Sequence, residues 1–209
     1  MLKSKKIKNI IIALFSILMS VGLYFGFFMD KLPLFFPNME NIEKNILALL
    51  ILIVTIYILL KIVFLIDTKK DRYILLLLYL FILVLGLLRP DKKYGEMGSL
   101  ALNPFGFISD IEANQTSILT LAINLVIFAP MYFLLTYTSI LNKSFFKILF
   151  FESFSILLEV LQFKLNVGTF DLSDILVYNI SFFTGYFISL PVLNLLRKLH
   201  NKTKEESSY

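Results

Sequence analysis

The sequence of 209 residues contains no cysteine and only one histidine. Without cysteine, the chain forms neither a disulfide framework nor a thiolate metal site. The histidine, His200, lies in a polar C-terminal segment, which excludes imidazole catalysis within a membrane. Charged residues are also scarce, at 17% against about a quarter in a typical soluble domain. These absences point away from disulfide-rich, zinc-binding and histidine-dependent proteins.

Hydrophobic residues are abundant, at 58%, and the mean hydropathy is +0.81. They form long uninterrupted runs, and a run of about 20 residues in a helix covers roughly 30 Å, enough to cross a bilayer. The sequence therefore predicts an all-α polytopic membrane helix bundle with six transmembrane helices. The predicted spans are Asn9–Met29, Ile46–Ile66, Tyr73–Leu88, Ile118–Tyr137, Ile148–Phe163 and Asp174–Leu196.

The net charge of +5 comes from basic residues that lie beside the predicted membrane ends. This placement follows the positive-inside rule, so the predicted partner is the lipid bilayer and no nucleic acid is predicted. With the N-terminus inside, the inner side holds 14 of the 20 basic residues. The outer side holds Lys31, Lys44, Arg89, Lys92, Lys93 and Lys164. Both termini are therefore predicted to be cytoplasmic.

Polar residues gather where this topology places the outer ends of the helices, above all in the stretch Leu157–Asn179. The residues at or near these ends are Arg89, Asn103, Asn124, Glu159, Gln162, Asp171 and Asp174. Those of the fifth span recur every three or four residues and form a stripe, and Asp174 begins a similar stripe on the sixth. Two adjacent helices with facing stripes predict a polar seam that opens outward.

Each polar residue also has a structural interpretation. Asp171 and Asp174 stand where a helix N-cap and first turn belong. Asn124 and Gln162 can serve as hydrogen bonds between helices, and Pro104 with Gly106 can form a turn. A cap does not explain Glu159, which lies inside its span, where a charged carboxylate costs several kcal/mol unless it is paired or wetted.

Ion-pair partners are available for the glutamates of the fifth span. Arg89 or Lys164 can pair with Glu159, and Lys147 can pair with Glu152. The acidic residues could also bind a divalent cation or a cationic ligand group, although their spacing demands neither. The sequence contains no HExxH, no G-x-S-x-G and no glycine-rich phosphate loop. No catalytic set, metal site or cofactor is predicted.

At these residues the chain resembles the VanZ-like family of bacterial membrane proteins, over roughly residues 73–190. The residues that carry the resemblance are Asn103-Pro104-Phe105, Asn124 with Pro130, Glu159 with Gln162, Phe170-Asp171 with Asp174, and Asn179 with Gly185. The resemblance implies a core domain at 73–196. Two additional N-terminal helices then occupy 1–72, and a basic polar tail occupies 197–209. It also implies a multi-pass protein of the bacterial plasma membrane.

The chain departs from the family pattern at three places. The family usually has an arginine shortly before the Phe-Asp pair, where this chain has Gly168 and Thr169. Where the family has a second acidic residue beside Asp174, this chain has Ser173, and Phe182 stands where a glycine is common. The missing arginine leaves open whether Arg89 takes its place or whether the activity differs.

Three functions remain open at this point. The resemblance implies a link to resistance against the glycopeptide antibiotic teicoplanin, with which the founding member of the family is associated. The favoured reading is a non-enzymatic envelope protein that binds a lipid, a lipid-linked envelope precursor or a glycopeptide. The alternatives are an enzyme acting on a lipid-linked substrate, with Glu159 or Asp171 as acid or base, and a small transporter with Glu152 and Glu159 on a proton path.

Overall fold

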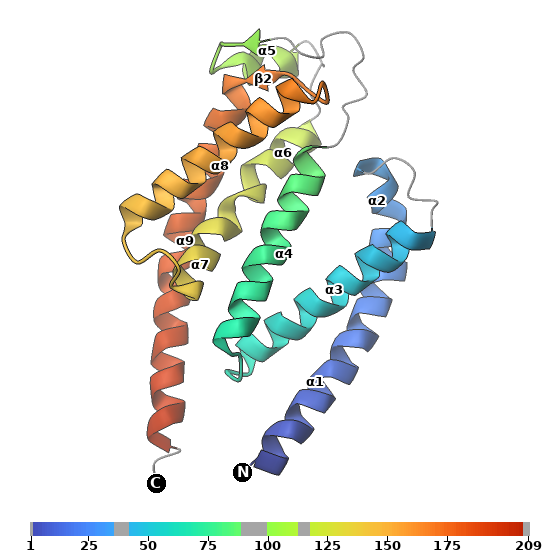
Figure 1. The fold of residues 1–209 in the computed structure, drawn as a ribbon, viewed down its shortest axis with the longest axis vertical. Helices are drawn as coiled ribbons and strands as arrows, with labels where there is room; N and C mark the ends of the chain where they lie inside the picture. The colour runs from blue at the N-terminus through green and yellow to red at the C-terminus, as the bar shows by residue number, and fades with distance from the viewer. Residues whose placement is uncertain (1, 36–41, 89–99, 113–117, 207–209) are drawn as a thin grey trace. The chain divides into compact units, whose positions relative to one another are not determined.

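In the computed structural model the described residues are 2–35, 42–88, 100–112 and 118–206, and they are almost entirely helical (Figure 1). This confirms the all-α class. The chain divides into two compact units, an N-terminal unit of Met1–Tyr79 and a C-terminal unit of Leu80–Tyr209. The boundary falls inside the helix α4, Lys69–Leu87.

In the N-terminal unit, a long helical segment packs against a second helix. The first segment is continuous and consists of α1 (Leu2–Leu23), the π-helix η1 (Tyr24–Phe28) and α2 (Met29–Phe35). It runs past the predicted end at Met29 and keeps Pro33 within α2. Its partner is α3 (Ile42–Val63), which packs along α1.

A buried ion pair closes the turn between α3 and α4 in the same unit. Lys61 and Asp71 have side chains that are only 8% and 12% exposed, and Lys61 Nζ lies 2.5 Å from Asp71 Oδ2. The same carboxylate oxygen accepts hydrogen bonds from the backbone N–H and the hydroxyl of Thr68, both at 2.7 Å. These contacts fix the start of α4 against the end of α3.

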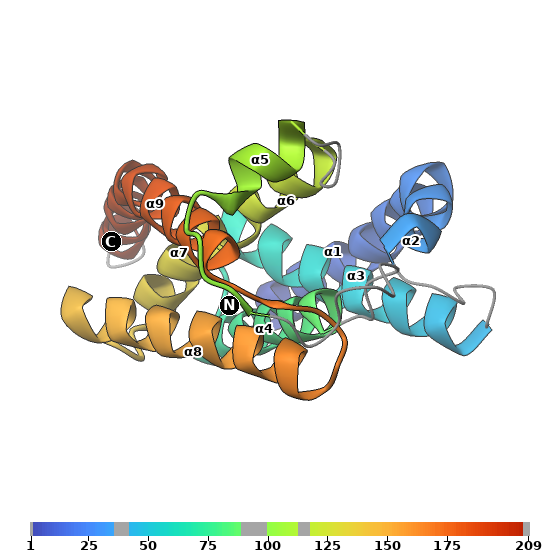
Figure 2. The same ribbon diagram turned by 90° about the horizontal axis from the view of Figure 1, so that it is seen from above.

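The C-terminal unit contains the rest of α4 and seven further elements. They are β1 (Leu100–Ala101), α5 (Gly106–Glu112), α6 (Ile118–Ile127), α7 (Ala129–Thr138), α8 (Ser144–Lys164), β2 (Phe170–Asp171) and α9 (Leu172–Glu206). Helix α9 is the centre of this unit, because α5, α6, α7 and α8 all contact it. Seen from above, α5 and α6 lie on one side of the first turns of α9, and α8 lies on the other (Figure 2). Helix α9 continues through the predicted polar tail as far as Glu206, since lysine, arginine and glutamate are good helix formers.

Two details of this unit do not follow from the hydropathy pattern. The strands β1 and β2 pair in parallel, with Leu100 opposite Phe170 and Ala101 opposite Asp171. The predicted fourth span is interrupted at Phe128, between α6 and α7. Pro130 explains the interruption, because proline has no N–H to donate and its ring clashes with the carbonyl four residues earlier.

Helix α9 stabilises this interruption. The backbone N–H of Phe128 donates to Ser181 Oγ at 3.1 Å. One turn further along α9, Gly185 lies so close to the break that a Cβ atom would stand 2.1 Å from the carbonyl oxygen of Ala129. Only glycine allows the two backbones to approach this closely.

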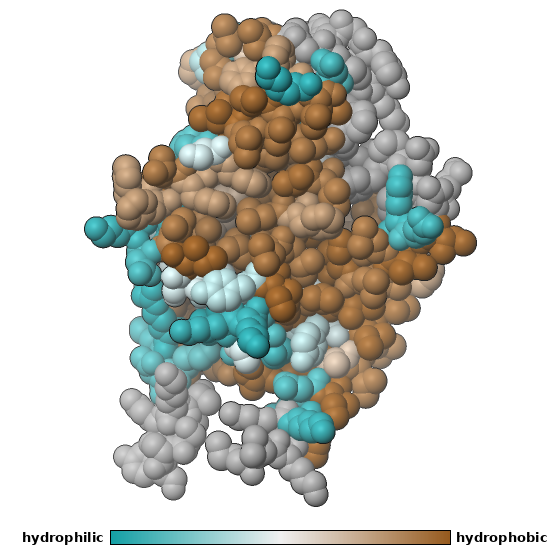
Figure 3. Space-filling model, in the orientation of Figure 1, coloured by the Kyte–Doolittle hydropathy of each residue, from teal (hydrophilic) through white to brown (hydrophobic). Residues whose placement is uncertain are grey.

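Among the described residues, four helical segments are long and apolar enough to cross a membrane. They are Lys6–Pro33, Ile42–Val63, Leu121–Thr138 and Leu172–Lys202. The other two predicted spans correspond to α4 and α8, which have 19 and 21 residues but carry charged side chains. Apolar residues cover most of the face seen in Figure 3, and hydrophilic residues gather toward the turn between α7 and α8.

Candidate functional site

Glu159, on α8, is a carboxylic acid buried inside the C-terminal unit. Its side chain is 0% exposed. Its Oε2 accepts a hydrogen bond of 3.1 Å from the backbone N–H of Asp171 in β2. Its Oε1 is the one buried side-chain oxygen or nitrogen in the described part of this unit that has no hydrogen-bond partner. Leaving a buried acceptor unpaired costs about 1–3 kcal/mol, and the described residues donate no hydrogen bond to Oε1.

A tight turn after α8 brings β2 back to this carboxyl group. Asn166 adopts the left-handed conformation, with φ of 53°, just beyond the end of the helix. The N–H of Val167 donates to the carbonyl oxygen of Gln162 at 3.0 Å. Asparagine tolerates this conformation better than most residues. An asparagine directly after the last helical residues is therefore the sequence signal for this turn.

Asp171 and Asp174 both lie at the start of α9, as the capping interpretation predicts. Asp171 Oδ1 accepts the backbone N–H of Ser173 at 2.7 Å, which confirms that Asp171 caps this helix. Asp174 does more than lie in the first turn, because its Oδ1 accepts a hydrogen bond of 3.4 Å from Asn124 Nδ2 on α6. The structure thus brings Asn124, Asp171, Asp174 and Glu159 together from α6, β2, α9 and α8.

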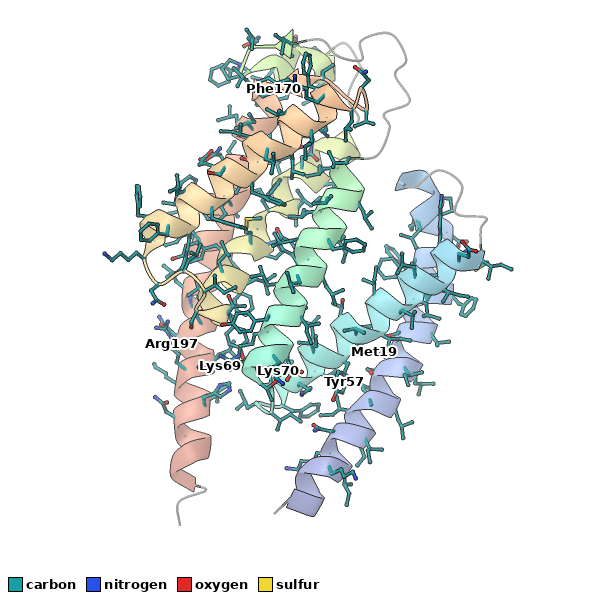
Figure 4. All side chains as sticks on the ribbon, in the orientation of Figure 1. Met19, Tyr57, Lys69, Lys70, Phe170 and Arg197 are labelled. Atoms are coloured by element: carbon teal, nitrogen blue, oxygen red, sulfur yellow. The ribbon has the colours of Figure 1, made fainter. Side chains whose placement is uncertain are left out.

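The surroundings of the Glu159 carboxyl group are acidic and aromatic. Asp174 and Asp171 are the charged neighbours that act on it, and the Tyr178 hydroxyl group lies close to it. Figure 4 shows the side chains of this end of the unit, next to the labelled Phe170. The acidic groups of Asp171 and Asp174 and the Tyr178 hydroxyl group thus form the polar surroundings of the Glu159 carboxyl group.

Gln162 forms a hydrogen bond with the backbone of another helix. Its Nε2 donates to the backbone carbonyl oxygen of Leu87 at 2.7 Å. Leu87 is the last residue of α4, where carbonyl groups have no partner within the helix. Gln162 therefore joins the end of α4 to α8, which agrees with its interpretation as a hydrogen bond between helices.

Two other predicted residues make only local contacts among those described. Asn103 is exposed, and its Oδ1 accepts the N–H of Phe105 in the turn before α5. Asn179 donates to the carbonyl oxygen of Ile175, within its own helix. Neither contact joins the residue to Glu159. Arg89 lies outside the described residues.

Two of the ion pairs predicted for the glutamates of α8, Lys164 with Glu159 and Lys147 with Glu152, do not form. Lys164 is exposed, and the partner of Glu159 is a backbone N–H rather than a lysine. Lys147 is buried, and its ammonium group lies 5.1 Å from the centre of the Tyr132 ring instead of pairing with Glu152. A cation over an aromatic face is stabilised by the ring quadrupole.

An aromatic cluster adjoins the acidic residues through Tyr178, and we call it the floor of the site. Phe128, Phe151 and Phe182 have fully buried side chains. The rings of Phe151 and Phe182 stack at 4.2 Å, and Phe128 packs against Tyr178 at 4.6 Å. Phe182 therefore fills the core. This packing keeps the floor of the site apolar.

The positions of the described side chains indicate which kind of ligand the site can bind. In the described part of the chain, no group of three or more histidine, cysteine, aspartate or glutamate side chains is arranged to hold a metal ion. In this arrangement, Glu159 Oε1 can accept a hydrogen bond from a donor group of a ligand. Comparison of the chain with protein-family models, with curated proteins and with solved structures finds no match.

Proposed function

We propose that this chain is a binding protein of the bacterial cell envelope, embedded in the plasma membrane with six spans. Both termini are cytoplasmic, and the acidic site at Glu159 faces outward. Its ligand is an envelope lipid, a lipid-linked precursor or a glycopeptide. In this orientation the site lies near the outer leaflet, where such molecules occur.

One observation carries the proposal: the unpaired Oε1 of a fully buried glutamate. A protein that needed Glu159 only to hold β2 would be served equally well by glutamine, whose side-chain oxygen also accepts the N–H of Asp171. A carboxylate also adds a second acceptor and repulsion from Asp171 and Asp174. Such destabilising features are typical of sites that bind something.

The six-span topology is supported by the lengths of α4 and α8. At 1.5 Å per residue, their 19 and 21 residues cover roughly 28–32 Å, close to the thickness of the hydrocarbon core. Gln162 joins the ends of these two helices at the level of the site. The charged groups on α8 are Lys147, Glu152, Glu159 and Lys164. Of these, Lys147 and Glu159 are buried in the protein rather than exposed to lipid.

The resemblance to the VanZ-like family supports an envelope function. Asn124, Glu159, Asp171 and Asp174 carry part of that resemblance and meet at one site. Binding is favoured over catalysis because Asp171 Oδ1 is already engaged as the cap of α9, and no complete catalytic set adjoins Glu159. On this basis the chain contributes to glycopeptide susceptibility by engaging the drug or its lipid-linked target.

The test uses the purified full-length chain in detergent and a panel of envelope lipids, lipid-linked precursors and a glycopeptide. We expect at least one member of the panel to raise the midpoint of thermal unfolding of the wild-type protein. The same ligand should not raise the midpoint of Glu159→Gln. Glu152→Gln is the matched control, because it makes the same change two turns away on α8 and should respond like the wild type.

A parallel measurement in cells follows glycopeptide susceptibility after deletion of the gene and after Glu159→Gln. The proposal fails if no member of the panel affects the wild-type protein and if susceptibility and envelope composition are unchanged. Turnover of a lipid-linked precursor by the purified protein would support the enzyme alternative. Proton-coupled uptake into proteoliposomes would support the transporter alternative.

A further inference from the structure

We infer that the group which Glu159 binds is the protonated primary amine of a membrane lipid headgroup, as in an ethanolamine phospholipid. The inference rests on the proposed function and specifies its ligand. Its first basis is the chemistry of Oε1, which can accept a hydrogen bond and receives none from the described residues, although the Tyr178 hydroxyl group lies close to the same carboxyl group. An ammonium group offers three donors on one small cation.

The charges around Oε1 favour a cationic donor over a neutral one. Asp174 and Asp171 are both acidic and both act on the Glu159 carboxyl group. A hydrogen bond from a cationic N–H group to a carboxylate is about twice as strong as a hydrogen bond between neutral groups. A metal ion fits less well, because the described acidic side chains do not form a set of three arranged to hold one.

The surface around the site indicates that the amine is carried by a lipid. On α8, Leu157 and Val160, which lie two residues before and one residue after Glu159 in the sequence, are 51% and 37% exposed. Above the first turns of α9, Leu102 and Phe105 are 62% and 60% exposed, in the segment that joins β1 to α5. Exposed leucine and phenylalanine side chains at a membrane boundary contact acyl chains and headgroups.

The same segment covers the site through short contacts. Strand β1 pairs with β2 over only two residues, Leu100–Ala101 with Phe170–Asp171. Gly106 at the start of α5 lies over Ser173, whose Oγ would be 3.7 Å from a Cβ atom on that glycine. Such limited pairing costs little to open, so a headgroup can enter beneath the segment from the bilayer surface.

The experiment compares two lipids that differ only at nitrogen. The full-length chain is placed in nanodiscs of neutral glycolipid with either an ethanolamine or a choline phospholipid of identical acyl chains, and bound lipid is counted by native mass spectrometry. Choline carries the same charge, but methyl groups replace its N–H donors. We expect the ethanolamine lipid to bind about ten- to a hundredfold more tightly, which is the range of one charge-assisted hydrogen bond.

A second arm uses free ethanolamine to distinguish a lipid headgroup from a soluble amine. Free ethanolamine should not compete with the ethanolamine lipid at comparable concentration. Effective competition would overturn the assignment to a lipid. Glu159→Gln should remove the preference for ethanolamine over choline, whereas Glu152→Gln should retain it. The lipid comparison on the wild-type protein needs no variant, so it stands even if Glu159→Gln fails to fold.

The outcomes separate this inference from the proposed function. If the wild-type protein binds a precursor or glycopeptide through Glu159 but treats the two phospholipids equally, the amine inference is wrong and the binding function holds. If the preference for ethanolamine persists in Glu159→Gln, the lipid binds elsewhere and the inference is wrong. If no ligand of either kind binds, both are wrong.

Discussion

The two carboxyl oxygens of Glu159 have different surroundings, so two substitutions at this position should differ in stability. Glu159→Ala leaves the N–H of Asp171 without its acceptor and should cost about 1–3 kcal/mol, in addition to the cavity that it creates. Glu159→Gln keeps that acceptor and removes repulsion from Asp171 and Asp174. Its unfolding midpoint, measured by circular dichroism, should be no lower than that of the wild type. Equal losses for both variants would show that both oxygens are structural.

Asp71 gives a prediction for pH. Burial raises the pKa of its carboxyl group, but the hydrogen bonds from Lys61 and Thr68 outweigh this effect and hold the pKa below the ordinary value of 3.8. Asp71 precedes the predicted span Tyr73–Leu88. A carboxyl group whose pKa is lowered in the folded state contributes stability above its unfolded pKa, and loses it as pH falls through the folded pKa.

The measurement is the free energy of unfolding of the wild type and Asp71→Asn between pH 7 and pH 2. At pH 7 the variant should be less stable by about 3 kcal/mol, because it leaves Lys61 buried without its partner. The difference should shrink once the pH falls below about 4. A difference that stays constant over the whole range would contradict the role given to the Asp71 carboxylate.

At the scale of the elements, the interrupted helix α6–α7 depends on α9. Gly185→Ala places a methyl group 2.1 Å from the carbonyl oxygen of Ala129 and should destabilise the C-terminal unit by about 1–3 kcal/mol. Gly86→Ala, on α4, is the control, because nothing lies within 4 Å of its added Cβ. The control should be neutral or stabilising by up to about 1 kcal/mol. Similar unfolding curves for both variants would show that the two helices separate easily.

The elements also show what the sequence could and could not predict. Long apolar runs predict the helices well, because hydrophobic length is a local property. The break at Phe128 was not predicted, although Pro130 marks it, because proline is tolerated in membrane helices when a neighbour supplies a partner. Here that partner is Ser181, which is distant in sequence. The pairing of β1 with β2 involves two residues per strand and has no periodicity to detect.

At the site, too, local sequence patterns predicted which residues take part, whereas contacts between distant residues could not be predicted. The polar stripe on α8 identified Glu159, and the proximity of Asp171 and Asp174 followed from the short turn between α8 and α9. The unpaired state of Oε1 could not be predicted, because it depends on three-dimensional contacts. The same holds for Gln162, whose partner is a backbone carbonyl of α4.

At the scale of the whole molecule, the number of spans can be tested with single cysteines, because the chain contains none of its own. With six spans and a cytoplasmic N-terminus, Asn142→Cys lies inside and Leu102→Cys lies outside. If only the four most apolar helices cross, the two positions exchange sides. We expect a membrane-impermeant maleimide to label Leu102→Cys in intact cells and Asn142→Cys only after the cells are opened. The reverse pattern would establish four spans and contradict the outward orientation of the site.

The central claim is that a ligand donor group reaches the Glu159 carboxyl group, and infrared difference spectroscopy tests it directly. Spectra of the full-length protein are recorded with and without the ethanolamine lipid, and the carboxyl bands are compared. The predicted result is a difference band in the wild type and in Glu152→Gln that is absent from Glu159→Gln. The same band in Glu159→Gln, or no carboxyl band in the wild type despite bound lipid, would contradict the claim.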